Sequence, residues 1–149
     1  MTTTMRRIIL RTNAVFLLAA SSFGMSADLA GAFFAVGPQR SILDAAPHAA
    51  IGFVEAHGLA FIIGVLLWRA EPLRLWHLTA AAVHALLGTA NLVFWQIFIA
   101  ADALWGGYLT TSLHWIFVML QLVGASSATS GQPSAGSSRR RGAMPAASA

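Results

Sequence analysis

Polar side chains recur at intervals of seven residues in each of the four apolar stretches of this sequence. In chain order they are Ser21 and Asp28, then His48 and Glu55, then His77, His84 and Asn91, then His114 and Gln121. Seven residues are about two turns of an α-helix, so each set would lie along one face of its helix. Carboxylates, imidazoles and amides bind small ligands or exchange protons, and in lipid they are costly unless they face the interior of a bundle. The pattern therefore predicts a polar site inside a helical membrane protein.

The reactive part of this site is expected to contain one ionisable residue from each stretch: Asp28, Glu55, His84 and His114. From the helical rise, the two histidines would lie near mid-membrane, with the two carboxylates just outward of them. Buried carboxylates close to each other favour sharing a proton. The structural alternative is that all four side chains only hold the helices together through hydrogen bonds.

Three further residues are candidates for holding a ligand beside these groups. Asn91 would hydrogen-bond to Glu55 or to a ligand, and Trp95 follows it near the outer end of the same stretch. His57 lies about 200° around the helix from Glu55, so the two side chains cannot point to the same place. The remaining polar residues would lie near the membrane interfaces, where water is available, and are expected to need no functional explanation; they are His48, His77 and Gln121.

The composition identifies the class of protein. Of the 149 residues, 57% are hydrophobic and only 9% are charged, whereas soluble domains carry about 25% charged residues. The sequence has no cysteine, which excludes disulfides and thiolate metal sites. All nine basic residues are arginines that lie at the ends of the apolar stretches and in the tail. Because that distribution is typical of membrane topology, we expect a lipid bilayer and no nucleic acid as partner.

The apolar stretches predict four membrane spans, since each has the roughly 20 residues that a helix needs to cross the hydrocarbon layer. The expected organisation is a basic head at 1–12, spans at about 13–36, 47–68, 75–101 and 103–124, and a disordered tail at 125–149. The predicted fold is thus all-α, an integral membrane four-helix bundle. The alternative is that the first stretch is a signal peptide cleaved near Ala27.

The arginines also predict the orientation. With the N-terminus inside, eight of them lie on the inner side and Arg40 alone lies outside. Positive charge accumulates on the cytoplasmic side of membrane proteins, so both termini are expected in the cytoplasm.

The polar site admits several functions. The first is binding of a small lipophilic ligand or exchange of protons, in a chain that could act as a homodimer. The second is a small membrane enzyme that performs acid–base isomerisation or ring opening. A third is a haem site with His84 and His114 as axial ligands, although the sequence identifies no cofactor and no other metal site. The fourth is an accessory or structural subunit without chemistry.

The segments Val54–Arg69 and His77–Phe98, together with the predicted architecture, resemble small bacterial four-helix membrane proteins of the DoxX-like type. That resemblance implies a bacterial cytoplasmic (inner) membrane protein and a quinone or other lipophilic ligand. A fainter likeness connects the intramembrane acids, and an asparagine near a tryptophan, with sterol-isomerase-like (EXPERA) proteins. In this sequence those residues are Asp28, Glu55, Asn91 and Trp95.

Overall fold

In a computed structural model of the protein, residues 1–128 are described, and over that part of the sequence every regular element is a helix. Four helices are long and two, α2 and α5, are short. They are α1 (Thr3–Phe34), α2 (Arg40–Ala45), α3 (Ala49–Arg69), α4 (Arg74–Val93), α5 (Gln96–Ala100) and α6 (Leu104–Ser126). The all-helical fold class predicted from the sequence is confirmed for these residues.

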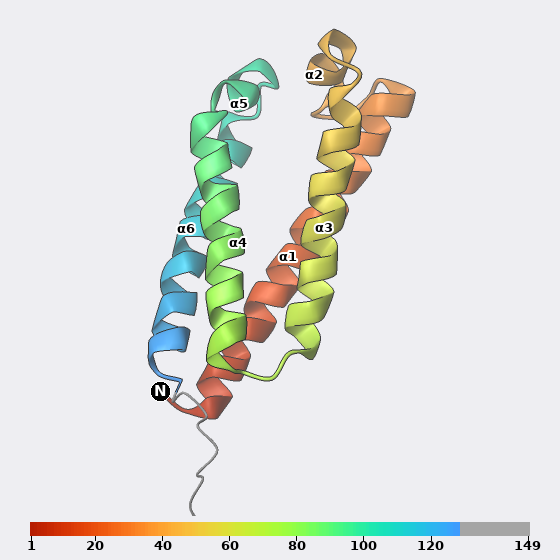
Figure 1. The fold of residues 1–149 in the computed structure, drawn as a ribbon. Helices are drawn as coiled ribbons and strands as arrows, with labels where there is room; N and C mark the ends of the chain where they lie inside the picture. The colour runs from red at the N-terminus through yellow and green to blue at the C-terminus, as the bar shows by residue number, and fades with distance from the viewer. Residues whose placement is uncertain (129–149) are drawn as a thin grey trace, which may run out of the picture.

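The long helices form two pairs, α1 with α3 and α4 with α6 (Figure 1). The pairs lie close together at the end of the molecule that contains the start of α1, the link between α3 and α4, and the end of α6. They diverge toward the other end, where α2 and α5 lie. Because α1 also contacts α6, its first half joins the two pairs.

The apolar core lies in the half of the molecule where the pairs meet. Its fully buried side chains come from three helices: Leu10, Ala14 and Leu17 on α1, Leu67 on α3 and Ala80 on α4. These positions on α1 recur at the three- and four-residue spacing of one helical face. The same face of α1 also carries polar residues, so packing of the apolar core fixes where those polar side chains lie.

Three helices are long and apolar enough to cross a membrane, namely α1, α3 and α6. Their outer surfaces carry large apolar side chains such as Phe23, Phe33 and Trp105, each more than 70% exposed. An apolar outer surface with polar groups inside is the distribution expected in lipid. The length and composition of these three helices therefore indicate a membrane-embedded protein. Helix α4 is not among the three, and it contains Arg74, His77, His84 and Asn91.

Several boundaries differ from those expected. The basic head belongs to α1, whose N-terminus is capped by Thr2 accepting a hydrogen bond from the Met5 amide. The third stretch divides into α4 and α5 at Phe94 and Trp95. At this break Trp95 packs against Phe98 and Tyr108, so tertiary contacts override a continuous apolar pattern. The tail was predicted to begin at 125, but Ala125 and Ser126 belong to α6, and its part from 129 to 149 lies outside the described residues.

Candidate functional site

Five buried polar side chains from three helices form one hydrogen-bonded chain. His77 Nδ1 lies 2.6 Å from Gln121 Oε1, and Gln121 Nε2 donates to Asn13 Oδ1 at 2.7 Å. Asn13 Nδ2 contacts His84 Nε2, and His84 Nδ1 lies 2.8 Å from His114 Nδ1. The first four side chains are completely buried, and His114 is 9% exposed. We call this set the histidine–amide chain.

Aromatic side chains enclose the histidine pair of this chain. The Phe117 ring stacks on His84 at a centroid distance of 5.0 Å, and Phe16 packs against both His84 and His114. Buried polar groups in apolar surroundings are costly unless they are hydrogen-bonded. Each side chain of the set is hydrogen-bonded to a side chain on another helix, although His77 Nε2 is buried without a partner.

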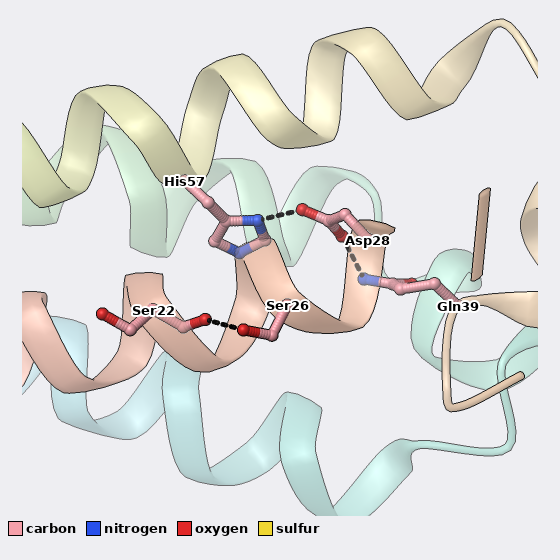
Figure 2. A network of polar contacts seen from close by, with 5 residues as sticks. All are labelled: Ser22, Ser26, Asp28, Gln39 and His57. Carbon is pink, nitrogen blue, oxygen red and sulfur yellow. Dashed lines mark hydrogen bonds and ion pairs between the residues drawn. The ribbon is translucent and has the colours of Figure 1, made fainter. Parts of the chain in front are cut away.

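A second polar cluster joins α1 and α3. Figure 2 shows His57 pointing from α3 toward Asp28 on α1, with Nδ1 2.5 Å from Oδ2. Gln39 Nε2 donates to the other carboxylate oxygen at 3.2 Å. Asp28 is fully buried, whereas the His57 side chain is 31% exposed. A buried carboxylate that receives two donors in this way holds the imidazole in one orientation.

Gly24 makes the approach of His57 possible. A Cβ atom built at this position would overlap the His57 ring, at Nε2 first. The absence of a side chain therefore lets the imidazole lie directly against α1, within reach of Asp28. This glycine therefore shapes the polar cluster as well as allowing the two helices to approach.

A cavity of about 460 Å³ lies between the two helix pairs, bordered by both polar clusters. Most of its wall is apolar and comes from α1, α3, α4, α5 and α6, with Phe16, Phe53 and Phe94 among the aromatic side chains. The polar residues at its surface are few. They are Ser21, Gln39, His57, Asn91, Thr110 and His114. A mostly apolar cavity with a small number of polar groups is typical of a small-molecule site.

The structure brings together only some of the residues predicted for the site. His84 and His114 pair with each other, and Asp28 pairs with His57 rather than with Glu55. Glu55 is exposed on α3 and forms no hydrogen bond or ion pair among residues 1–128. The expected buried Asp28–Glu55 cluster is therefore not what the structure contains, because the helix rotation that faces His57 toward α1 turns Glu55 outward.

The other two candidates lie toward the α5 end of the molecule. Asn91 lines the cavity and donates a hydrogen bond to Thr110 Oγ1 at 3.3 Å. Trp95 packs at 4.9 Å from the Tyr108 ring centroid and does not line the cavity.

Two residues expected at a wet interface belong to the interior. His77 and Gln121 are fully buried and form one end of the histidine–amide chain. Asn13, the residue that joins the chain across three helices, was not among the predicted site residues. The signal for it was present, because Asn13 lies seven residues after Arg6 and eight before Ser21, on one face of α1.

The geometry of the histidine pair does not fit axial ligation of haem. An axial ligand needs a free ring nitrogen, but in His84 both are used, Nε2 by Asn13 and Nδ1 by His114. Among residues 1–128 no group of three or more potential ligand residues is placed to hold a metal ion.

These two polar clusters and the cavity that they border form the candidate site for binding or chemistry in the described part of the protein. Comparisons with protein-family models, with curated proteins and with solved structures found no match to this chain, so the interpretation depends on the geometry of the site itself.

Proposed function

We propose that this protein binds a small lipophilic ligand in the cavity between the α1–α3 and α4–α6 pairs. The cavity carries the argument: its volume of about 460 Å³ is within the range of small-molecule sites, and its wall is largely apolar. A ligand reaching this cavity from the bilayer would keep its apolar body in apolar surroundings. The polar groups at the wall would fix its orientation.

We further propose that the four long helices form a bundle in the inner membrane of a bacterium, with both termini in the cytoplasm, as in the DoxX-like proteins that the sequence resembles. The start of α1 and the link between α3 and α4 lie at the same end of the molecule (Figure 1), and Arg7 pairs there with Glu71 of the link. Arginines at both segments on one side support this orientation. In this arrangement α6 packs along α4, and His77 and His84 of α4 are fully buried, which would lower the cost of these polar residues in lipid.

A second candidate function is acid–base catalysis on the bound molecule, and the Asp28–His57 pair favours it. A carboxylate that orients an imidazole is a recurrent arrangement for proton transfer. His57 Nε2 has no hydrogen-bond partner among the described residues, and the ring borders the cavity. His57 would move the proton and Asp28 would stabilise the charged imidazole.

Ligand binding is tested by native mass spectrometry of the purified protein in detergent. Ala90 on α4 lines the cavity, whereas Ala82 on the same helix is exposed. The Ala90→Phe variant should lose a discrete adduct because the new ring fills the cavity, while the matched Ala82→Phe variant should retain it. An adduct kept at equal occupancy in both variants would locate it outside the cavity and contradict the proposal.

A further inference from the structure

The histidine–amide chain has a direction, because an amide donates only through nitrogen and accepts only through oxygen. Gln121 donates to Asn13, and the Asn13 amide nitrogen contacts His84 Nε2, which must then accept. The proton of His84 is therefore on Nδ1 and points at His114 Nδ1. His114 in turn carries its own proton on Nε2. Because all the bonds run in one direction, His77 Nε2 at one end of the histidine–amide chain is an acceptor, and His114 Nε2 at the other end is a donor.

Exchanging the nitrogen and oxygen positions of both side-chain amides, Asn13 and Gln121, would reverse the direction of every hydrogen bond. The surroundings of the two terminal histidines therefore determine which direction is favoured. At one end, His77 Nε2 is buried without a hydrogen-bond partner, and so is Arg6 Nε. In the observed direction His77 Nε2 is a bare acceptor, whereas in the reversed direction it would be an unsatisfied buried N–H donor.

The position of Arg6 favours the observed direction. Arg6 precedes Asn13 by seven residues on α1, and His77 precedes His84 by seven on α4. The two helices run in the same direction (Figure 1), so Arg6 lies at the level of His77, as Asn13 lies at the level of His84. An arginine can only donate hydrogen bonds, and its positive charge is better placed beside a lone pair than beside an N–H group.

At the other end, His114 lies at the wall of the cavity. Its side chain is more than nine-tenths buried, and its Nε2 forms no hydrogen bond among residues 1–128. The chain thus presents an N–H donor to an otherwise largely apolar space. A donor in such surroundings is stabilised when an acceptor group of the cavity's occupant reaches it.

We propose that the ligand is a lipophilic carbonyl compound whose carbonyl oxygen accepts a hydrogen bond from His114 Nε2–H. This inference rests on the proposed function and adds the chemical class of the ligand. Asn13 and Gln121 are positioning residues, which fix the tautomer of His114 without touching the ligand. A ketone and a fatty ester share this chemistry, and the experiment below separates them.

The first test measures binding of three probes with similar chains: 2-tridecanone, methyl laurate and tridecane. At equal concentration in the micelle, the carbonyl probes should bind about tenfold more tightly than the alkane. His114→Phe should abolish that difference, while His48→Phe, which replaces an exposed histidine outside the cavity, should preserve it. Preference for the ketone alone or for the ester alone identifies the source of the carbonyl group.

The second test needs no variant. Nitrogen NMR of histidine-labelled protein, with ring signals assigned from side-chain to backbone correlations, reports which nitrogen of each ring carries the proton. His114 should carry it on Nε2 and His84 on Nδ1, and the carbonyl probes should shift the His114 Nε2 signal. The opposite tautomers would overturn the inference, as would equal binding of alkane and ketone in a cavity that Ala90→Phe closes. Failure of all three probes to bind would instead count against the proposed function.

Discussion

His84 and His114 face each other through their Nδ1 atoms, 2.8 Å apart. Two ring nitrogens at this distance share one proton, because two N–H groups would repel and two lone pairs would not bond. The rings come from α4 and α6, and Phe117 stacks on one of them. The pair therefore links the two helices through a polar contact in apolar surroundings, and it depends on Asn13 to remain in one tautomer.

Replacing Asn13 with leucine should destabilise the protein more than any other single amide replacement. The change leaves Gln121 Nε2 and His84 Nε2 without partners in a fully buried place. We expect the free energy of unfolding to fall by about 1–3 kcal/mol, since each buried contact of this kind is worth roughly 0.6–1.7 kcal/mol in membrane proteins. Equilibrium unfolding in mixed micelles measures it. Asn91→Leu is the control and should cost less, because Asn91 is only partly buried and has one bond of 3.3 Å.

The two acids of the membrane helices should respond differently to neutral amide replacement. Asp28→Asn replaces one carboxylate oxygen by an amide NH2 group, which would face one of the two existing donors, His57 or Gln39. Because two donors cannot bond to each other, the stability should fall by about 1–3 kcal/mol. Glu55→Gln should not reduce the stability, because Glu55 is exposed and forms no hydrogen bond or ion pair among residues 1–128. Thermal unfolding of the two variants, prepared side by side, makes the comparison. Equal losses would show that Glu55 has a buried partner.

Gly24→Ala should displace His57 from Asp28. The added methyl group would overlap the imidazole, and the ring can escape only by rotating away from the carboxylate. We expect a loss of about 1–3 kcal/mol, as for other insertions into packed interiors. The control is Gly52→Ala on α3, where a Cβ meets no atom within 4 Å. That variant should gain up to about 1 kcal/mol from helix propensity. A stabilised Gly24→Ala variant would be inconsistent with the described packing.

The proposed topology is accessible to cysteine labelling, since the natural sequence contains no cysteine. Glu71 lies in the link between α3 and α4, and Ala46 lies between α2 and α3; both positions are exposed. The two variants are Glu71→Cys and Ala46→Cys. In intact cells an impermeant maleimide should label Cys at 46 and leave Cys at 71 unmodified until the membrane is opened. The reverse result would invert the orientation, and labelling of both would exclude a spanning α3.

The helical class and its membrane character follow from composition and apolar stretches, because those properties are summed over many residues. The break between α4 and α5 does not follow from them. It depends on Trp95 packing against Tyr108, a contact between positions that no local pattern connects. The helical start at Thr3 was missed for a different reason: Arg6 and Arg7 suggested a solvated head, although Leu10 of the same turns is part of the core.

Periodicity predicted which residues share a face of one helix, but it could not predict which helix each face meets. The seven-residue spacing therefore placed His84 and His114 among the buried residues, and the structure pairs them. Whether Glu55 or His57 faces Asp28 depends on the rotation of α3 about its own axis. That rotation is fixed by packing of α3 against α1, which the sequence pattern does not reveal.

Two of the histidines lie against a glycine of a neighbouring helix: His57 against Gly24 and His77 against Gly124. In each case the space for the histidine is the side chain that the glycine lacks. Related sequences should therefore change these positions together, so that a larger residue at 24 or 124 accompanies a smaller one at 57 or 77. Such paired substitutions would identify the interior of this fold in distant relatives whose sequences otherwise retain little but their apolar character.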